Sequence, residues 1–278
     1  MAGHPGFCGK MGHVNELPSE IDTSRPHAAR IYDYYLGGKN HFAADRETAD
    51  KVLQAWPHAR VAAREQRKFL GRAVRYLTEA AGIRQFLDIG TGLPTANNTH
   101  QIAQSVAPAS RIVYVDNDPL VLVHARALLT SDPQGATAYI DADLHDPGTI
   151  LAEAAGTLDL TQPVALTLLG VVNFISDDDQ AYSIVRRLVD AVPSGSYLVV
   201  SHTITSPTTA AMDSAVAFWN EHGTPKLTQR TPEQVARLFD GLEVLEPGVV
   251  SCSRWRPEAT PFGEPAEVAL YGGVGRKS

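Results

Sequence analysis

The pattern of hydrophobic residues differs between two regions of the chain. From residue 25 to residue 84, apolar positions recur every three or four residues, which is the period of amphipathic helices. From residue 85 onward, short apolar runs alternate with stretches of helical pattern. The expected strands are Gln85–Ile89, Arg111–Asp116, Ala136–Asp141, Val164–Phe174 and Ser196–His202. The helices expected between and after them span about residues 94–107, 118–130, 147–156, 177–192 and 206–222.

This strict alternation predicts right-handed crossovers and a parallel sheet covered on both faces. The run Val164–Phe174 is apolar almost throughout, which is typical of a strand buried on both sides. A capping box at Thr231 opens a short helix, and two strands, about Leu242–Val250 and Glu267–Tyr271, then follow without a helix of comparable length between them. We therefore predict an α/β sandwich of three layers. Its sheet is mostly parallel and seven-stranded, with an antiparallel pair at one edge.

The N-terminal quarter has a different organisation. Residues 1–24 show no periodicity and predict a mobile tail. A helix is expected to begin near Ser24–Pro26 and to stop at Gly37–Gly38, a second covers Ala43–Ala55, and a third runs from about Pro57 to Ala81. The predicted organisation is thus a tail (1–24), a helical lid region (25–84) and a cofactor-binding domain (85–278).

The first predicted strand carries the strongest chemical signal, Asp88-Ile89-Gly90-Thr91-Gly92. A strand that runs into a Gly-x-Gly turn and a helix, expected to start near Pro94, lets the backbone approach a ligand closely. A dinucleotide fingerprint would place a third glycine at position 95, where Thr95 stands. Asp88 would repel a pyrophosphate but attract an ammonium group. S-adenosylmethionine carries an ammonium, a sulfonium and no phosphate.

Acidic residues also end the next two strands. Asp116 follows Asp88 by 28 residues and Asp143 follows Asp116 by 27, so one strand–helix unit separates each pair. All three should meet at the carboxyl edge of the sheet, where open α/β sheets bind ligands. Asp116 could accept the two ribose hydroxyls and Asp143 an adenine amine, with Leu144 offering a backbone N–H. Helix capping, which explains Asp118 and Asp146, is the alternative interpretation.

Composition narrows the class of protein. The formal net charge is −7, which opposes binding to a phosphate backbone, and we expect no nucleic-acid partner. The longest nearly apolar stretch, Val164–Ile175, is shorter than the roughly 20 residues that cross a bilayer, so we expect a cytoplasmic protein without a membrane partner. Two cysteines give neither a disulfide scaffold nor a metal finger. The Asp141–Asp146 segment does not indicate a metal site.

These residues resemble the successive cofactor motifs of class I S-adenosylmethionine-dependent methyltransferases. The block Ala29–Asn40, with Phe42–Arg46, Trp255–Pro257 and the closing Tyr271–Arg276, is similar to one actinobacterial family of such enzymes whose substrate is unassigned. The resemblance covers about residue 24 to the C-terminus. It implies a Rossmann-like class I methyltransferase fold and S-adenosylmethionine as cofactor. Pro94 departs from the broad class pattern, which often has a third glycine there.

Candidate site residues follow from the motifs and the resemblance. The cofactor-binding candidates are Asp88, Gly90, Thr91, Gly92, Asp116, Asn117, Asp143 and Leu144. The lid and substrate candidates are Arg30, Tyr34, Lys39 and Asn40, with Arg30 or Lys39 near the methionine carboxylate. The catalytic candidates are His202, Asn173 and Tyr35; His202 could take a proton. We expect a small-molecule acceptor, and peptide or protein acceptors stay open.

Other interpretations compete with this one. A nicotinamide-dependent oxidoreductase would use a similar sheet, but Asp88 and Thr95 argue against it. A sensor or scaffold that binds the cofactor without turnover would carry the same motifs. The basic stripe Arg60–Arg75 is expected to be a solvated face or to pair with the protein's own carboxylates, and a docking face for an anionic acceptor or acidic partner is the alternative.

Overall fold

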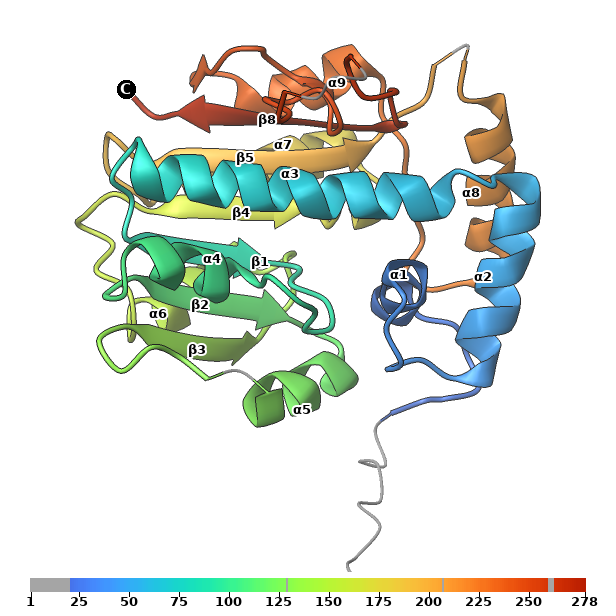
Figure 1. Cartoon of the computed structure of the whole chain (residues 1–278), viewed down its shortest axis with the longest axis horizontal. Helices are drawn as coiled ribbons and strands as arrows, with labels where there is room; N and C mark the ends of the chain where they lie inside the picture. The colour runs from blue at the N-terminus through green and yellow to red at the C-terminus, as the bar shows by residue number, and fades with distance from the viewer. Residues whose placement is uncertain (1–20, 129, 207, 260–262) are drawn as a thin grey trace, which may run out of the picture.

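A mixed sheet crosses the middle of the molecule in the strand order β3-β2-β1-β4-β5-β8-β6 (Figure 1). The computed structural model describes residues 21–128, 130–206, 208–259 and 263–278. Five strands run parallel: β1 (Gln85–Ile89), β2 (Arg111–Asp116), β3 (Ala136–Asp141), β4 (Ala165–Leu169) and β5 (Tyr197–Thr203). The reversal of strand order beside β1 creates the crevice in which such sheets bind ligands.

The antiparallel edge is built on β8 (Leu270–Arg276), which pairs with β5 along its whole length. Two short strands, β6 (Glu243–Val244) and β7 (Val250–Ser251), pair with different parts of β8. The sheet is therefore seven strands wide, and the predicted fold class is confirmed. The expected continuous strand Leu242–Val250 is wrong, because a turn closed by the Gly248 N–H and the Leu245 carbonyl (2.9 Å) interrupts it.

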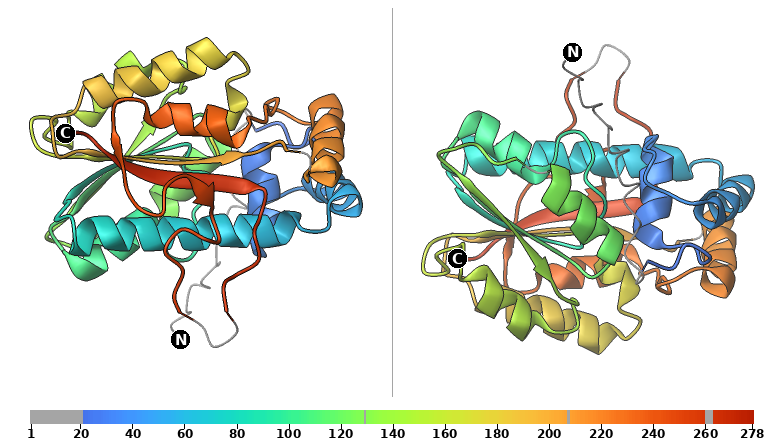
Figure 2. Two further views of the ribbon diagram at one scale, coloured as in Figure 1. Left: turned by 90° about the horizontal axis from the view of Figure 1, so that it is seen from above. Right: turned by 90° about the horizontal axis from the view of Figure 1, so that it is seen from below.

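Helices cover both faces of the sheet. Helices α3 (Ala59–Glu79), α4 (Thr99–Val106) and α5 (Pro119–Leu128) lie on one face, and α6 (Pro147–Ala154), α7 (Asp178–Asp190) and α9 (Pro232–Ala236) with the 3-10 helix η2 (Arg237–Phe239) lie on the other (Figure 2). Helices α1 (Ala28–Leu36), α2 (Ala43–Ala55) and α8 (Ala210–His222) stand beyond the carboxyl ends of the parallel strands (Figure 1). The expected lid region, residues 25–84, therefore consists of two parts. Helix α3 packs on the sheet, whereas α1 and α2 stand at the strand ends.

Two predicted boundaries in the sheet domain are wrong for physical reasons. The helix expected from Pro94 begins only at Thr99, because Arg67 binds the carbonyl oxygens of Ala96 and Asn97 and holds that segment as a loop. The strand expected to reach Phe174 ends at Leu169, and the 3-10 helix η1 (Val172–Phe174) follows. Val172 and Ile175 are buried in this segment although they lie outside a strand, so the hydrophobic run marked burial and not strand.

The start of the chain also differs from expectation. His27, not Ser24, is the N-cap residue of α1. Most of the predicted mobile tail, residues 1–20, lies outside the described residues. Ile21, within the predicted tail, is 8% exposed and packs with Leu93, Leu120 and Val121. None of the helices in the described ranges is both long enough and apolar enough to cross a membrane.

Two hydrophobic clusters, one on each face of the sheet, form the core. On the α3 face, Phe69 meets Trp255 edge-on with ring centroids 5.4 Å apart, and both rings are fully buried. Trp255 follows β7 in the chain, so this contact joins the N-terminal part of the chain to its C-terminal part. The cluster fixes the position of α3. The N-terminal end of this helix reaches the carboxyl ends of the parallel strands.

Replacing this buried ring should weaken the fold. We expect Phe69→Ala to lower the free energy of unfolding by about 3–5 kcal/mol, because the lost ring leaves a cavity against Trp255. Urea denaturation followed by circular dichroism measures the change. The control is Val61→Ala on the same helix, where the side chain is 46% exposed and the change should stay within about 0.5 kcal/mol. Equal losses in the two variants would contradict the packing described here.

Candidate active site

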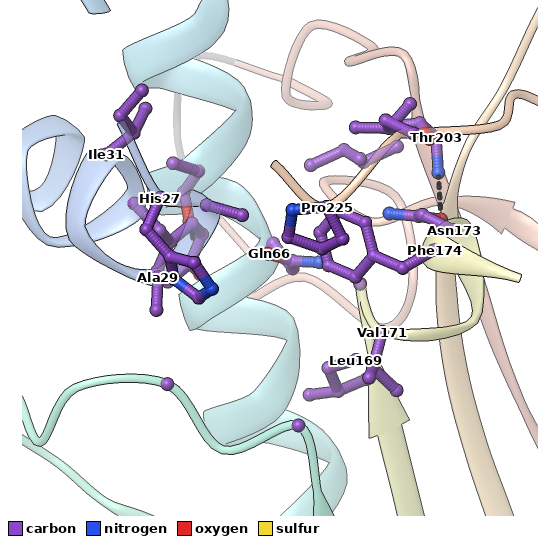
Figure 3. A pocket seen from close by; sticks show the side chains of 18 of the residues that line it. His27, Ala29, Ile31, Gln66, Leu169, Val171, Asn173, Phe174, Thr203 and Pro225 are labelled. Atoms are coloured by element: carbon purple, nitrogen blue, oxygen red, sulfur yellow. Dashed lines mark hydrogen bonds between the residues drawn. The ribbon is translucent and has the colours of Figure 1, made fainter. Parts of the chain in front are cut away.

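A cavity of about 350 Å³ opens at the carboxyl ends of the parallel strands, between the strand tips and helices α1, α2, α3 and α8 (Figure 3). Its volume lies within the range of small-molecule sites. The structure brings all eight cofactor-binding candidates into its lining. They are Asp88, Gly90, Thr91, Gly92, Asp116, Asn117, Asp143 and Leu144.

Asp88 is buried at the end of β1, and both of its carboxylate oxygens accept hydrogen bonds. The Thr99 hydroxyl donates to Oδ2 at 2.6 Å and the Thr167 hydroxyl donates to Oδ1 at 2.8 Å. Burial raises the pKa of Asp88, and these two hydrogen bonds oppose the rise. The carboxylate therefore joins β1 to α4 and β4, while each oxygen keeps a lone pair for a ligand.

The turn after β1 depends on the absence of a side chain at Gly90. Its φ is 74°, and a Cβ there would lie 2.4 Å from the Cβ of Val171. The Val171 side chain, in the loop after β4, can therefore pack directly against the backbone of the turn after β1. Gly92 also has a positive φ, 65°, and a Cβ there would meet no atom within 4 Å, so the turn is open on that side.

Asp116, at the end of β2, binds the same turn. Its Oδ2 accepts the Gly92 N–H at 2.8 Å and its Oδ1 accepts the Asp118 N–H at 3.0 Å. Burial raises the pKa of Asp116, and the two backbone N–H groups oppose this. The buried Asp88 and the half-buried Asp116, both with raised pKa values, favour a positively charged or hydrogen-donating ligand beside them.

Asp143 follows β3 and is more exposed. Its Oδ1 accepts from the backbone N–H and Nδ1 of His145 (2.8 and 2.6 Å), and its Oδ2 accepts from Asn117 Nδ2 (3.0 Å). Burial raises the pKa of Asp143, but the hydrogen bonds from His145 and Asn117 outweigh it, so the pKa is lowered. No group of three or more His, Cys, Asp or Glu that could hold a metal ion occurs in the described ranges.

Arg67 on α3 is a site residue that sequence reasoning missed. Its Nη2 donates to the carbonyl oxygens of Ala96 and Asn97 (3.1 and 2.9 Å) and to Asn98 Oδ1 (3.0 Å), and the side chain lines the cavity. Its Nε is buried without a hydrogen-bond partner among the described residues. Among the described residues that line the cavity, Arg67 is the only arginine or lysine, and its positive charge acts to lower the pKa of Asp88.

The basic stripe Arg60–Arg75 is thus not one uniform surface. Besides Arg67, Arg72 turns inward and donates to the carbonyl oxygens of Cys252 and Trp255 (2.6 and 2.8 Å). Lys68 pairs with Glu65 and Arg75 pairs with Glu79, as expected for a face that is neutralised locally. Spacing alone could not separate these roles, because α3 turns some of its cations toward the protein and others toward solvent.

The four lid candidates lie outside the lining that the described residues form. Tyr34 donates from its hydroxyl to Asp50 at 2.8 Å, and Lys39 is exposed. The Asn40 N–H donates to Asp33 Oδ2 at 2.8 Å. A Cβ at Gly38 would overlap the Asp33 carboxylate at 2.0 Å. Much of this polar block is therefore explained by the turn that wraps around the buried Asp33.

Arg30, the fourth candidate, contacts the rim of the site. It is 4% exposed, and its Nη2 lies 3.4 Å from Asp118 Oδ1. His27 Nδ1 lies 3.0 Å from the other Asp118 oxygen, and His27 lines the cavity. Burial raises the pKa of Asp118, but His27 and Arg30 outweigh this and lower it. Two N-terminal residues thus hold α1 against the loop after β2.

Among the catalytic candidates, Asn173 and Tyr35 line the cavity and His202 does not. Asn173 Oδ1 accepts the Thr203 N–H at 3.1 Å, and its amide nitrogen points into the cavity (Figure 3). Tyr35 donates from its hydroxyl to the Ala49 carbonyl at 3.5 Å. His202 is fully buried, with Nδ1 2.7 Å from the Thr203 carbonyl oxygen and Nε2 2.8 Å from Arg230 Nη1. Both ring nitrogens are occupied, so His202 is not placed to accept a proton from an acceptor.

Arg230, which sequence reasoning did not identify as a site residue, holds the segment that carries Asn173. Its guanidinium is fully buried and donates to the carbonyl oxygens of Val172 (3.3 Å) and Ile175 (2.9 Å), on either side of Asn173. It also pairs with Asp178 at 3.0 Å. A single arginine 57 residues downstream of Asn173 gives no sequence signal for this contact.

The helical end of the cavity was also missed, apart from Tyr35. It is lined by Trp56 after α2 and by Met212, Ala215 and Trp219 of α8. Periodicity had placed α8 only as a helix after β5. Its position across the strand ends depends on tertiary packing against α2 and α1, in which Trp219 packs with Ile31 and Ala49.

Comparisons with known proteins agree with this geometry. A family described as S-adenosyl methyltransferase matches residues 14–278. A DUF574 family protein from Streptomyces avermitilis MA-4680 is 46% identical, with a TM-score of 0.88, and the match covers 92% of this chain and 99% of that one. A proposed methyltransferase from Thermobifida fusca YX is 41% identical, with a TM-score of 0.85, and the match covers 94% and 98% of the two chains. None of the curated proteins compared with the chain matches it.

The burial of His202 should appear in the pH dependence of stability. Burial lowers its pKa to about 3, whereas an unfolded histidine titrates near about 6.5. The unfolded chain therefore binds a proton that the folded chain does not, and stability falls as the pH drops from about 6.5 toward about 3. We expect His202→Gln to remove a slope of up to about 1.4 kcal/mol per pH unit from the free energy of unfolding in this window.

Urea denaturation at several pH values measures this slope. His58→Gln, at an exposed position before α3, is the matched control and should follow the wild-type curve. Parallel curves for wild type and His202→Gln would show that His202 is not held neutral.

Proposed function

Because this chain belongs to the S-adenosyl methyltransferase family, we propose that it binds S-adenosylmethionine at the strand ends and transfers a methyl group to a small-molecule acceptor. One observation supports this most strongly. Carboxylates from three successive strand ends, Asp88, Asp116 and Asp143, line one cavity together with the Gly90–Gly92 turn. Such a cluster disfavours a pyrophosphate and complements a cationic nucleoside.

The residues present fit this cofactor. Asp116 and the open turn at Gly92 would hold the ribose, since a carboxylate can accept from two hydroxyls. Asp143 and Leu144 would hold the adenine. Arg67, whose Nε has no partner among the described residues, would pair with the carboxylate of the methionine part, the role that the sequence had assigned to Arg30 or Lys39. Asp88 would balance the ammonium group.

Methyl transfer from a sulfonium requires little of the protein beyond the alignment of the acceptor with the methyl group. When bound, S-adenosylmethionine supplies an activated methyl group on a sulfonium. An acceptor's lone pair would form the new bond to this methyl carbon, the electrons of the broken C–S bond would stay on sulfur, and any surplus acceptor proton would pass to solvent. The side chains orient the acceptor and exclude water, and alignment of this kind can contribute on the order of 7–11 kcal/mol. Asn173, held by Thr203 and Arg230, offers an amide at the end of β4 for this purpose.

Isothermal titration calorimetry with S-adenosylhomocysteine tests the proposed contacts. We expect Asp116→Asn and Arg67→Gln each to weaken binding about 10- to 100-fold, because each removes a hydrogen bond to a charged group worth about 1.5–3 kcal/mol. Arg64→Gln, one helical turn from Arg67 and exposed, is the control and should bind like the wild type.

Two further measurements separate the alternatives. Tighter binding of NAD than of S-adenosylhomocysteine would reject the methyltransferase in favour of an oxidoreductase. Labelled methyl groups from S-adenosylmethionine should enter a small molecule of a cell extract. Tight cofactor binding without any incorporation across broad acceptor pools would favour a sensor.

A further inference from the structure

The cavity has two chemically different ends. Among the described residues, its lining aspartates, Asp88, Asp116 and Asp143, lie at or just after the ends of the strands. The opposite end is formed by α1, α2 and α8 and by Trp56, which follows α2. Among the described residues that line the cavity from these helices, none is Asp, Glu, Lys or Arg. We refer to this end, which includes Tyr32, Tyr35, Trp56, Met212, Ala215 and Trp219, as the helical chamber.

The polar atoms of three of the chamber's aromatic side chains, Tyr32, Tyr35 and Trp219, already have partners in the protein. Tyr32 donates to the Ala63 carbonyl at 3.2 Å, and Trp219 Nε1 donates to the Pro225 carbonyl at 2.9 Å. Burial raises the pKa of Tyr32 and of Tyr35, so both phenols stay neutral. The chamber therefore offers mainly ring faces and methyl groups to a ligand.

Unsatisfied polar atoms lie where the chamber meets the strands. Thr203 is 7% exposed and lines the cavity, and its hydroxyl oxygen has no hydrogen-bond partner among the described residues. Asn173 uses its oxygen to accept the Thr203 N–H, and its amide nitrogen points into the cavity (Figure 3). Buried polar groups are rarely left without a partner, so this pair indicates a position for one polar atom of a ligand.

Charge decides which acceptors can enter. A carboxylate or ammonium in the helical chamber would lose its hydration, which is strongly unfavourable without an opposite charge. The one lining cation among the described residues, Arg67, acts on Tyr32 but is assigned to the cofactor's carboxylate in the proposed function, so it would not be free to pair with an acceptor. An anion would also be repelled by the three aspartates, and a cation would bind more favourably among those aspartates than in the chamber. A neutral ring system loses little hydration and gains contact with the apolar walls.

We infer that the acceptor is an uncharged, largely apolar ring compound that carries one hydrogen-bonding group, directed at Asn173 and Thr203. This inference rests on the proposed function, since it assigns the helical chamber to the acceptor. It excludes carboxylated and ammonium-bearing metabolites and charged peptide side chains as acceptors.

The test uses probes that share a naphthalene ring and differ in charge. They are 2-naphthol, 2-naphthoate, 2-naphthylmethylammonium and 2-methylnaphthalene. Their fluorescence reports binding to the full chain saturated with S-adenosylhomocysteine at neutral pH. We expect 2-naphthol to bind at least about tenfold more tightly than either charged probe, because neither charge has a partner in the chamber.

Three variants locate the binding. Ala215→Phe fills the chamber and should abolish naphthol binding, while Ala217→Phe, an exposed position on the same helix, should not change it. Thr203→Val should weaken 2-naphthol about five- to tenfold and leave 2-methylnaphthalene unchanged, because only the former has a hydroxyl to lose a partner. Each variant is first shown to bind S-adenosylhomocysteine like the wild type.

The outcomes distinguish the two proposals. Failure of the wild-type chain to bind S-adenosylhomocysteine overturns the proposed function and this inference with it. Normal S-adenosylhomocysteine binding, with a charged probe bound as tightly as 2-naphthol, overturns this inference alone. So does naphthol binding that survives Ala215→Phe unchanged.

Discussion

A carboxylate buried at the end of a central strand must be hydrogen-bonded, and at Asp88 this requirement shapes the whole site. Its partners, Thr99 and Thr167, come from the helix after β1 and from the neighbouring strand β4. The carboxylate therefore fixes where α4 begins and how β4 sits beside β1. The loop between Gly90 and Asn98 has to close within these limits, and Arg67 holds it from the other side. Replacing either threonine by an apolar residue would leave a buried carboxylate oxygen with fewer partners.

Much of the fold could be predicted from the sequence because it depends on local periods. Strands such as Gln85–Ile89 and Arg111–Asp116 have the predicted bounds, since apolar runs buried on both faces are distinct from amphipathic helices. The eight cofactor-binding candidates all line one cavity for a related reason. The carboxyl ends of parallel strands meet at one edge, so strand register alone brings them together. Their roles toward a ligand stay predictions.

The remaining features depend on contacts between distant segments. His202 ends a strand as expected, but Arg230, from a segment that follows α8, occupies its Nε2. Arg30 and Arg67 look alike in a helical pattern, yet one meets Asp118 and the other lines the cavity. The helical chamber arises only where α2 and α8 pack together. The sequence shows which side chains are acidic, basic or aromatic. The direction in which a side chain on a helix points depends on the elements that pack against that helix.

The close approach of Val171 to Gly90 couples the two halves of the site mechanically. The two loops can lie this close only because residue 90 is glycine, since any larger side chain at this position would meet Val171. Val171 is two residues from Asn173, on a segment that Arg230 holds at its carbonyl oxygens. Under the proposed function, a displacement at the end of the site that holds the nucleoside would thus be transmitted through this segment to the end that holds the acceptor. Under that function, a change at residue 90 that made room for a bulkier nucleoside would therefore also shift the segment that carries Asn173.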